Sequence, residues 1–338
     1  FAATPQLLSR TDALSLLMNS LNFVCRIPGS PVPLPAKSAL FEWIPRAEYE
    51  DVPALSYSLI KKWLELESVP TEFKWWLADR WTQPKSEALI LGDALDCWML
   101  NGPESFSERF ATVMKDAPRR PTQIQRHAKN PSSTTLQQIA YWDEFARLNA
   151  GKTILEAEQM WTIEQMTKNL NCSKATDGGA LFRECKKTTA IALELFGGVP
   201  WKSEFDLWNP TTDTMCDLKV ARDVTAPVFG RDFVNWGYAV QACVYLSMAQ
   251  SFGYDKKVFA LITVKREAPY SVKVHRFNLQ NDRHAALFKS VGSLIATSVA
   301  RLLEAAEKNF EDDGEWVDLQ LPDWAVRASQ NQELLLMP

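Results

Sequence analysis

The sequence predicts an α+β protein built around a central sheet. Five segments between residues 186 and 277 carry the alternating or short apolar patterns of β-strands, and helical apolar patterns stand before, between and after them. Hydrophobic residues make up 46% of the 338 residues and charged residues 23%, which is typical of a folded chain and excludes a disordered one. A chain of this length buries a sizeable core, as one large domain or two smaller ones.

The first fifty residues are rich in proline. Six prolines fall here, and residues 27–35 alternate proline with small and apolar residues, which excludes a helix or a central strand. We therefore expect residues 27–35 to be extended, behind a possible short helix at about 11–22, within a Pro-rich N-terminal arm over residues 1–50. From Ser56 the pattern becomes helical, because Ser56 or Ser58 can cap a helix that runs through Leu64.

The remaining elements follow from periodicity and turn residues. Helices are expected at 88–100, 134–148, 156–170 and 231–250, with a basic loop at 115–129. Strands are expected at 186–195, 200–208, 215–220, 258–264 and 271–277, and residues 209–213 form a turn. A long amphipathic helix closes the body, with its apolar positions spaced as on one helical face at Leu287, Val291, Ile295, Val299 and Leu302.

The charge is unevenly distributed. The chain has 37 Lys and Arg against 41 Asp and Glu, a net charge of −4, which by itself is poor evidence for a nucleic-acid-binding protein. Eight acids and one base between Glu304 and Asp323 carry −7, which leaves +3 on the other 318 residues. A slightly basic body thus precedes an acidic tail. No uninterrupted apolar run of about 18 residues occurs, so no membrane-spanning helix is expected.

The strongest group of candidate catalytic residues lies between 184 and 245. Adjacent antiparallel strands would bring Asp206 and Asp217 together at one edge of the sheet, and Lys219 points to the same face as Asp217. Two carboxylates suit Mg²⁺, and a lysine beside them can orient or deprotonate a water and stabilise developing charge. Glu184, just upstream of the first strand, is the candidate third carboxylate.

The spacing Asp-x-Lys is common, and by itself it more often marks a solvated strand face. Here its context favours a site. Asp217 and Lys219 stand between apolar neighbours, a second aspartate precedes them, and the following helix presents Gln241 and Tyr245 on one face.

These residues carry a resemblance. Glu184, the segment 201–206, Asp217-Leu218-Lys219 and Gln241-x-x-x-Tyr245 together resemble the PD-(D/E)xK nuclease pattern in its RecB-like form. The wider order resembles the RecE (exodeoxyribonuclease VIII) group, related to the lambda exonuclease. Residues 55–60 resemble that group's Ser-x-Ser helix start, residues 91–96 resemble its Gly-x-x-x-His helix, and residues 141–145 with Gly151-Lys152 resemble the segment that links them to the core.

The resemblance implies a restriction-endonuclease-like core, a central mixed sheet flanked by helices, with an N-terminal helical extension. The resemblance covers roughly residues 50–310 and implies an exonuclease domain over residues 51–310. The Pro-rich arm 1–50 and the acidic tail 311–338, which we expect as separate parts, have no counterpart in it. Within the domain, residues 51–175 would be mainly helical and residues 176–310 would form the catalytic core.

The resemblance also implies roles. Asp206, Asp217 and the Leu218 carbonyl would hold Mg²⁺ or Mn²⁺, Glu184 would complete the metal site or position water, and Lys219 would assist the attacking water. Gln241 and Tyr245 would orient the scissile strand or the lysine. Asp96 stands where the group has histidine, and it is either a further metal ligand or a structural polar residue.

DNA contacts are expected at two places. Ser58, with Ser56, lies at a helix N-terminus, where free N–H groups favour a terminal 5′-phosphate. The basic loop is the best candidate for contacts to the phosphate backbone, through Arg119, Arg120, Arg126 and Lys129, although a solvated loop has the same composition.

The function expected from the resemblance is that of a metal-dependent exodeoxyribonuclease that degrades linear double-stranded DNA from 5′ to 3′. It implies recombination by single-strand annealing with a RecT-like protein, a ring-shaped homo-oligomer, no membrane, and the cytoplasm of a bacterial or phage-infected cell.

Two alternatives stay open. One is another nuclease of the same core, either a structure-specific endonuclease or a Cas4-like enzyme, although the latter needs four cysteines for an iron–sulfur cluster and no cysteine follows Cys243. The other is a catalytically silent DNA-binding module of the same fold.

Overall fold

A six-stranded sheet forms the centre of the computed structural model, which describes residues 34–35, 37–41, 44, 46–79, 84–311 and 314. The strand order is β1-β4-β5-β6-β7-β8; β6 and β7 run parallel and the other neighbours antiparallel, so the predicted α+β fold with a mixed sheet is confirmed. The strands are β1 (Ala39–Phe41), β4 (Lys186–Ala192), β5 (Trp201–Trp208), β6 (Thr214–Ala221), β7 (Val258–Lys265) and β8 (Val272–Asn278).

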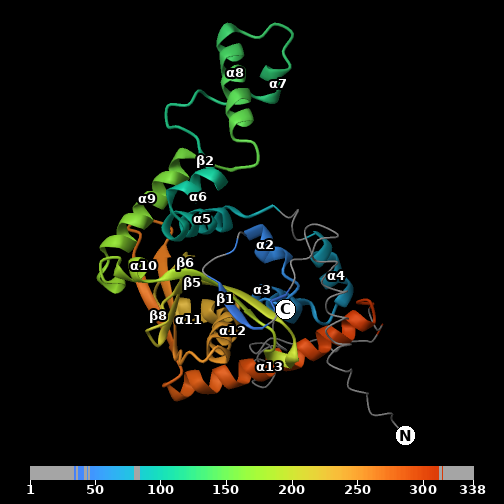
Figure 1. Ribbon diagram of the computed structural model, residues 1–338. Coiled ribbons are helices and arrows are strands. Elements are labelled where there is room, and N and C mark those ends of the chain that lie inside the picture. Colours follow the sequence, from blue (N-terminus) through green and yellow to red (C-terminus); the bar gives the residue numbers. More distant parts are fainter. Residues whose placement is uncertain are drawn as a thin grey trace, which may run out of the picture.

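Helices cover both faces of this sheet (Figure 1). Because successive strand side chains point to opposite faces, Phe259 and Leu261 of β7 join one core, whereas Ala260 and Ile262 join the other. The first core is closed by α3 (Tyr57–Leu66), α11 (Ala226–Asn235), α12 (Tyr238–Ser251) and α13 (Asp282–Glu307). The second is closed by α5 (Glu87–Asp96) and α9 (Ala157–Cys172).

The helix α12 is apolar around most of its circumference and lies in the centre of the first core. Ten of its fourteen residues are buried, as expected for a helix without a polar face. Its two long polar side chains in the middle, Gln241 and Tyr245, are therefore held inside the protein, beneath β5 and β6.

The predicted helix at 231–250 is in fact two helices. Gly237 separates α11 from α12 and has φ of 72°, a backbone conformation that favours glycine. A Cβ at this position would also lie 2.9 Å from Cδ of Lys61 in α3. The apolar pattern runs through both helices, so periodicity alone does not reveal the break.

Part of the proline-rich segment belongs to the sheet. Residues Ala39–Phe41 form β1 and pair antiparallel with Thr189–Ile191 of β4, and α2 (Arg46–Asp51) follows. The last residues of the predicted Pro-rich arm 1–50 thus form β1 and α2. The expected helix at 11–22, most of the remaining arm and most of the acidic tail lie outside the described residues.

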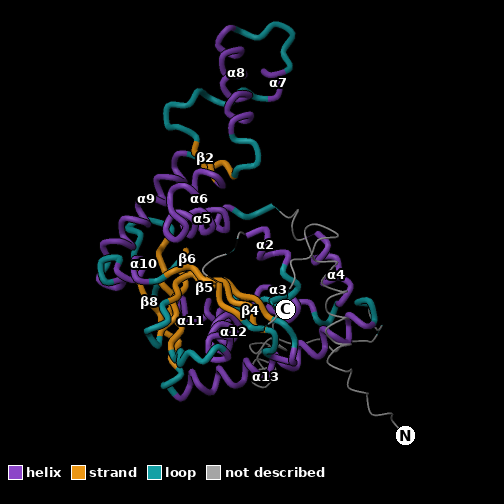
Figure 2. The backbone as a smooth tube through the Cα atoms, in the orientation of Figure 1, coloured by secondary structure: helices purple, strands orange, loops and turns teal. Residues whose placement is uncertain are grey.

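Two helices project away from the body (Figures 1 and 2). They are α7 (Gln123–Arg126) and α8 (Ser133–Leu148), and they lie between the short parallel strands β2 (Phe110–Thr112) and β3 (Thr153–Leu155). We call residues 113–152 the projecting arm. The sequence did not indicate several short elements: α4 (Pro70–Asp79), a π-helical segment (Cys97–Asn101), α6 (Gly102–Arg109), α10 (Ala180–Glu184), β2 and β3.

By length and composition, α13 is a helix that could cross a membrane, although the sequence contains no uninterrupted apolar run of that length. Its residues Val291, Ile295, Val299 and Leu302 are buried in the first core, so the helix packs along the body of this protein. A core helix passes the same test of length and composition, and the match is weak evidence for a membrane span.

Candidate active site

A pocket of about 400 Å³ opens where β5 and β6 separate. The ladder between these strands has one residue pair, Leu207 with Cys216. The next residue on each strand is an aspartate, so Asp206 and Asp217 flank the point of separation. The two carboxylates lie together as predicted, but in the middle of the sheet and not at its edge.

A β-bulge determines how Asp206 is presented. Lys186 pairs with Trp208 and Thr188 with Phe205, so two residues of β5, Asp206 and Leu207, oppose the single residue Lys187 of β4. Bulges commonly redirect a side chain beside an active site. The Asp206 carboxylate accepts a hydrogen bond from the backbone N–H of Leu218 at 3.4 Å, which ties it to the neighbouring strand.

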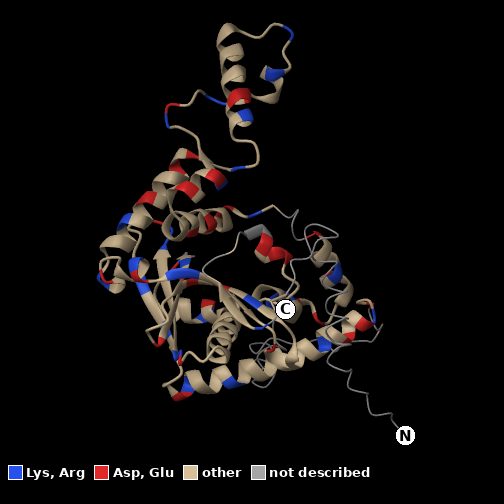
Figure 3. Cartoon of the chain, in the orientation of Figure 1, with Lys and Arg blue, Asp and Glu red and all other residues tan. Residues whose placement is uncertain are grey.

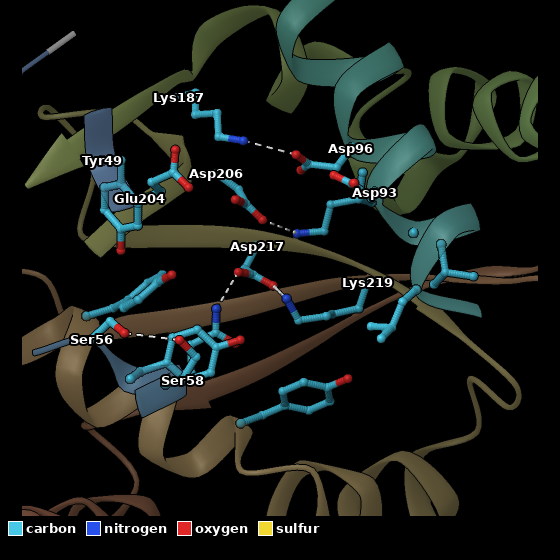
Figure 4. A pocket seen from close by; sticks show the side chains of 18 of the residues that line it. Tyr49, Ser56, Ser58, Asp93, Asp96, Lys187, Glu204, Asp206, Asp217 and Lys219 are labelled. Carbon is cyan, nitrogen blue, oxygen red and sulfur yellow. Dashed lines mark hydrogen bonds and ion pairs between the residues drawn. The ribbon is translucent and has the colours of Figure 1, made fainter. Parts of the chain in front are cut away.

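Asp217 is held by two partners. Its side chain is 1% exposed; Oδ1 accepts a hydrogen bond of 2.6 Å from Nε2 of Gln241, and Oδ2 forms an ion pair with Nζ of Lys219 (Figure 4). A buried carboxylate requires such partners. Burial alone would lower the pKa of Lys219, but Asp217, Tyr57 and Asp206 raise it above its usual range, so its ammonium group stays charged.

Tyrosines form the other side of the pocket. Tyr245 packs edge-on against Tyr57 at a centroid distance of 5.9 Å, and Nζ of Lys219 lies 5.5 Å from the ring centre of Tyr238. Burial, followed by the nearby carboxylates, raises the pKa of Tyr245, so its hydroxyl is neutral. Both residues of the predicted pair Gln241 and Tyr245 therefore line the pocket.

Asp96 enters the pocket from the C-terminal end of α5. Burial and the charge of Asp206 raise the pKa of its carboxyl group to about 6, against the opposing effect of Lys187. Burial and the charge of Asp217 raise the pKa of Asp206 to about 7. Both pKa values are raised because carboxylates repel one another in a poorly solvated pocket.

Two residues that bring charge to the centre of this pocket were not predicted from the sequence. Nζ of Lys187 lies 3.0 Å from Oδ2 of Asp96, and Glu204 also lines the pocket. Glu204 lies two residues before Asp206 on β5, a spacing that places side chains on one strand face and that could have identified it. Lys187 is positioned by the bulge, which has no signature in a single sequence.

Glu184, in contrast, does not reach the pocket. It ends α10 as an exposed residue, and its carbonyl accepts a hydrogen bond from Asn209 at 3.4 Å. The chain enters β4 two residues later, so the side chain that β4 directs toward Asp96 is that of Lys187. The expectation that Glu184 supplies the third carboxylate has no support in this geometry.

The N-terminus of α3 forms part of the pocket lining. Ser56 caps this helix, accepting from the N–H of Leu59, and its hydroxyl lies 3.0 Å from that of Ser58. Both serines line the pocket together with Tyr57. Asp93, one turn before Asp96 on α5, lies there too, but it is neutralised by ion pairs with Lys85 and Arg109.

The basic residues expected to hold DNA lie on the projecting arm and outside the pocket (Figure 3). Two of them form ion pairs: Arg120 with Glu156 and Arg126 with Asp143, both at 2.7 Å. Arg120 also lies over the ring of Trp142 at 4.4 Å. Arg119 and Lys129 are exposed, as is Lys115 nearby, and these three present charge to solvent.

The donor set fits a small divalent cation of the Mg²⁺ type. Such an ion is commonly held by one or two carboxylates, with water and substrate oxygens completing its shell, and Asp206 and Asp217 meet that requirement. In addition, the buried Oε1 of Gln241 accepts no hydrogen bond from the described residues, which leaves a polar atom beside Asp217 for a water or substrate. Within the described part of the chain, no three His, Cys, Asp or Glu side chains are grouped to hold a metal. Asp96 lines the pocket together with Asp206 and Asp217, whereas Glu184 does not, so the role of Asp96 as a further ligand stays a prediction.

Comparison with known proteins shows a family and a similarity to a solved structure. A family model described as a PDDEXK-like domain of unknown function (DUF3799) matches residues 56–307. The chain is also similar to a crystal structure of a protein named "Putative exonuclease" from Eubacterium rectale, with 16% identity, a TM-score of 0.43, and coverage of 81% of this chain and 93% of that one. A search of curated proteins finds no match.

Proposed function

The chain belongs to the PDDEXK-like domain family DUF3799, and we propose that its acidic pocket is the active site of a metal-dependent DNA exonuclease. The observation that carries the proposal is the meeting of Asp206, Asp217 and Lys219 at the separation of β5 and β6, with Gln241 bonded to Asp217. Two carboxylates and a charged lysine in one buried place are costly to assemble unless they have a use.

In this proposal Asp206 and Asp217 hold Mg²⁺ or Mn²⁺, and the Leu218 carbonyl lies beside them. The ion supplies Lewis acidity to a phosphoryl oxygen and lowers the pKa of a bound water. Gln241 fixes the orientation of Asp217 through its 2.6 Å hydrogen bond. The raised pKa of Asp206 indicates that the negative charge of its carboxylate is poorly neutralised. A bound cation would therefore stabilise Asp206 more than Asp217.

Lys219 acts as a fixed positive charge. Its pKa is raised by Asp217, Tyr57 and Asp206, so in the resting site it donates hydrogen bonds and does not accept a proton. It therefore orients the attacking water and stabilises the negative charge that develops on the phosphate, as preorganised charges do in phosphoryl transfer. Of the two roles the sequence allowed for this lysine, general base and electrostatic stabiliser, the second is the one we propose.

DNA binding follows from two features. The exposed bases Lys115, Arg119 and Lys129 on the projecting arm suit backbone phosphates, whose contacts dominate non-specific affinity. Ser56 and Ser58 with the N-terminus of α3 offer hydrogen-bond donors within the pocket and suit a terminal 5′-phosphate. These positions favour an enzyme that starts at a duplex end and moves from 5′ to 3′.

The finer assignments remain part of the proposal. They are membership of the RecE-like group, a ring-shaped homo-oligomer, a RecT-like annealing partner, and recombination in the cytoplasm of a bacterial or phage-infected cell. A Cas4-like enzyme is less favoured, because no cysteine cluster that could hold an iron–sulfur centre occurs among the described residues.

Digestion of defined substrates tests the proposal. Wild-type protein is incubated with 5′-phosphorylated linear duplex, with the same duplex labelled at either end, and with closed circular DNA, each in Mg²⁺ or Mn²⁺ and in EDTA. We expect metal-dependent loss of the linear DNA only, with early release of the 5′ label. Cleavage of the circle would indicate an endonuclease, and no loss of any substrate would indicate a silent DNA-binding module.

A further inference from the structure

A second pocket adjoins the candidate active site. It has a volume of about 310 Å³, and the side chains of Asp206 and Lys187 line both pockets. These two residues come from the neighbouring strands β5 and β4 and oppose each other at the β-bulge. A phosphate that reacts beside Asp206 would therefore have an open space on each of two sides.

The second pocket differs from the first in its charge. The first gathers the carboxylates of the site, among them Asp96 and Asp217. Among the described residues that line the second pocket, Asp206 is the one acid, and Lys186 and Lys187 are the bases. A weakly basic lining suits the phosphate backbone of a nucleic acid better than it suits a metal ion.

The rest of this lining suits the base and sugar of a nucleotide. Met99, Leu100 and Phe182 supply apolar surface, and Ser105 and Asn101 supply hydrogen-bonding groups. Oδ1 of Asn101 is buried and accepts no hydrogen bond from the part of the chain that the structure describes, so an N–H group of a bound base would satisfy it. Sites for small ligands commonly combine apolar walls with a few polar groups, in cavities of about 300 Å³ or more.

An irregular stretch of backbone connects the two pockets. The helix α5 ends at Asp96, which lines the first pocket, and continues as the π-helical segment Cys97–Asn101. The last three residues of that segment line the second pocket. π-Helical turns are rare and are frequently found at functional sites. One continuous piece of chain thus delivers a carboxylate to the first pocket and an amide to the second.

We infer that the second pocket binds the nucleotide that follows the scissile phosphate, so that one strand is held on both sides of Asp206. This role rests on the proposed exonuclease function and deepens it. Figure 4 indicates the direction of the strand, because the serines Ser56 and Ser58 lie on one side of Asp206 and Lys187 lies on the opposite side. The 5′-terminal nucleotide would lie beside the serines, and the second nucleotide beyond Lys187.

Binding of short 5′-phosphorylated oligonucleotides tests the second pocket. Calorimetric titration of the full chain measures the affinity for thymidine 5′-monophosphate and for the corresponding 5′-phosphorylated dinucleotide, with Ca²⁺ in place of Mg²⁺ and with the absence of digestion checked. In wild type the second nucleotide should strengthen binding by at least about fivefold, which is the lower end of the contribution of one stacked base.

A variant that fills the second pocket should remove this gain. Ser105→Phe places a ring in the pocket, so the dinucleotide should bind no more tightly than the mononucleotide, whose affinity should stay as in wild type. Ser107→Phe is the matched control, because Ser107 is an exposed residue of the same helix, α6, and lines neither pocket. It should behave as wild type, and circular dichroism checks that both variants are folded.

Alkylation of cysteines gives a readout on the wild-type protein. Cys185 lines the second pocket and is half-buried, whereas Cys172 is exposed and lines neither pocket. In Ca²⁺ a saturating dinucleotide should slow the reaction of Cys185 with N-ethylmaleimide, and a saturating mononucleotide should not. The rate at Cys172, measured in the same sample by mass spectrometry of peptides, should be unchanged by either.

Three results would overturn the inference. Equal affinity of wild type for the two ligands would show that the second nucleotide has no site. The full gain in Ser105→Phe, or unchanged reactivity of Cys185 with the dinucleotide bound, would show that the second nucleotide binds elsewhere. In each of these cases the proposed function stands if linear DNA is digested in Mg²⁺ or Mn²⁺. If neither ligand binds and no DNA is digested, both fail.

Discussion

Gln241 donates a hydrogen bond of 2.6 Å to Asp217, and this contact joins the central helix α12 to the carboxylate at the separation of β5 and β6. Partners that orient a metal ligand typically change metal affinity or activity by about 10–100-fold when they are removed. Gln241→Leu should therefore lower the rate of metal-dependent DNA digestion by about that factor. Gln241→Glu should lower it further, because it places a second negative charge against Asp217. Initial rates at saturating metal measure both, and an unchanged rate in the leucine variant would show that Lys219 alone positions Asp217.

The raised pKa of Asp206 predicts how stability depends on pH. An unfolded aspartate has a pKa of about 3.9, whereas Asp206 in the folded protein has a pKa of about 7. Because the folded pKa is the higher, the contribution of this group to stability is complete below about pH 4 and is lost as the pH rises to about 7. Asp206→Asn, which stays neutral, should thus raise the melting temperature of the metal-free protein at about pH 8 and leave it nearly unchanged at about pH 4. Thermal unfolding in EDTA measures this, and a difference that does not vary with pH would contradict it.

Metal binding should show the opposite dependence on pH. Protons compete with the cation for Asp206, so the ion binds more tightly as the pH rises through about 7. The rise in melting temperature on addition of Ca²⁺ should accordingly grow from about pH 5 to pH 8 in wild type. Asp255→Asn, which removes an exposed carboxylate far from the pocket in sequence, should behave as wild type. A calcium effect equal at both pH values would mean that the ion binds elsewhere.

The exposed bases of the projecting arm predict a salt-dependent contribution to DNA affinity. Each phosphate contact contributes about −0.9 to the slope of log K against log salt concentration. Replacing Lys115, Arg119 and Lys129 together by alanine should make that slope shallower by up to about 3 and weaken binding to all sequences equally. Lys289→Ala, on the exposed side of α13, is the control. Fluorescence anisotropy at several salt concentrations gives the slopes, and equal slopes would exclude the arm from the DNA path.

The position of Ser58 predicts that the enzyme prefers DNA ends that carry a 5′-phosphate. It is exposed in the first turn of α3, and its hydroxyl lies beside that of the capping Ser56. Wild type should digest a 5′-phosphorylated duplex faster than a 5′-hydroxyl duplex, and Ser58→Ala should reduce this ratio. Ser133→Ala, an exposed serine in the first turn of α8, should not change it. Equal digestion rates of the two duplexes by wild type would show that the enzyme does not recognise the 5′-phosphate.

The fold was largely predictable from local pattern. The five expected strands are all present within a few residues of their expected bounds, because each combines an apolar pattern with flanking turn residues. The break at Gly237 and the strand β1 were not predictable in the same way. The first lies within an apolar pattern that continues through both helices, and the second depends on pairing with β4 across some 150 residues.

The site was predictable where spacing along one element determines which side chains meet. Asp217 with Lys219, and Gln241 with Tyr245, are such cases, and all four line the pocket. Glu184 was predicted to belong to the site and Lys187 was not, because a bulge in β5 and the end of α10 decide which side chain faces Asp96. Both features depend on how α10 ends and how β4 pairs with β5, and the spacing of apolar residues in the sequence does not reveal either.

The central claim is that the pocket around Asp217 cleaves DNA, and one comparison tests it most directly. Release of acid-soluble nucleotides from 5′-phosphorylated linear duplex is measured in Mg²⁺ or Mn²⁺ for wild type, Asp217→Asn and Asp255→Asn, all three shown to be folded. We expect release by wild type and Asp255→Asn, and a loss of about 100- to 1,000-fold in Asp217→Asn, comparable to the removal of a central electrostatic group in other hydrolases. Equal release by Asp217→Asn and wild type would contradict it.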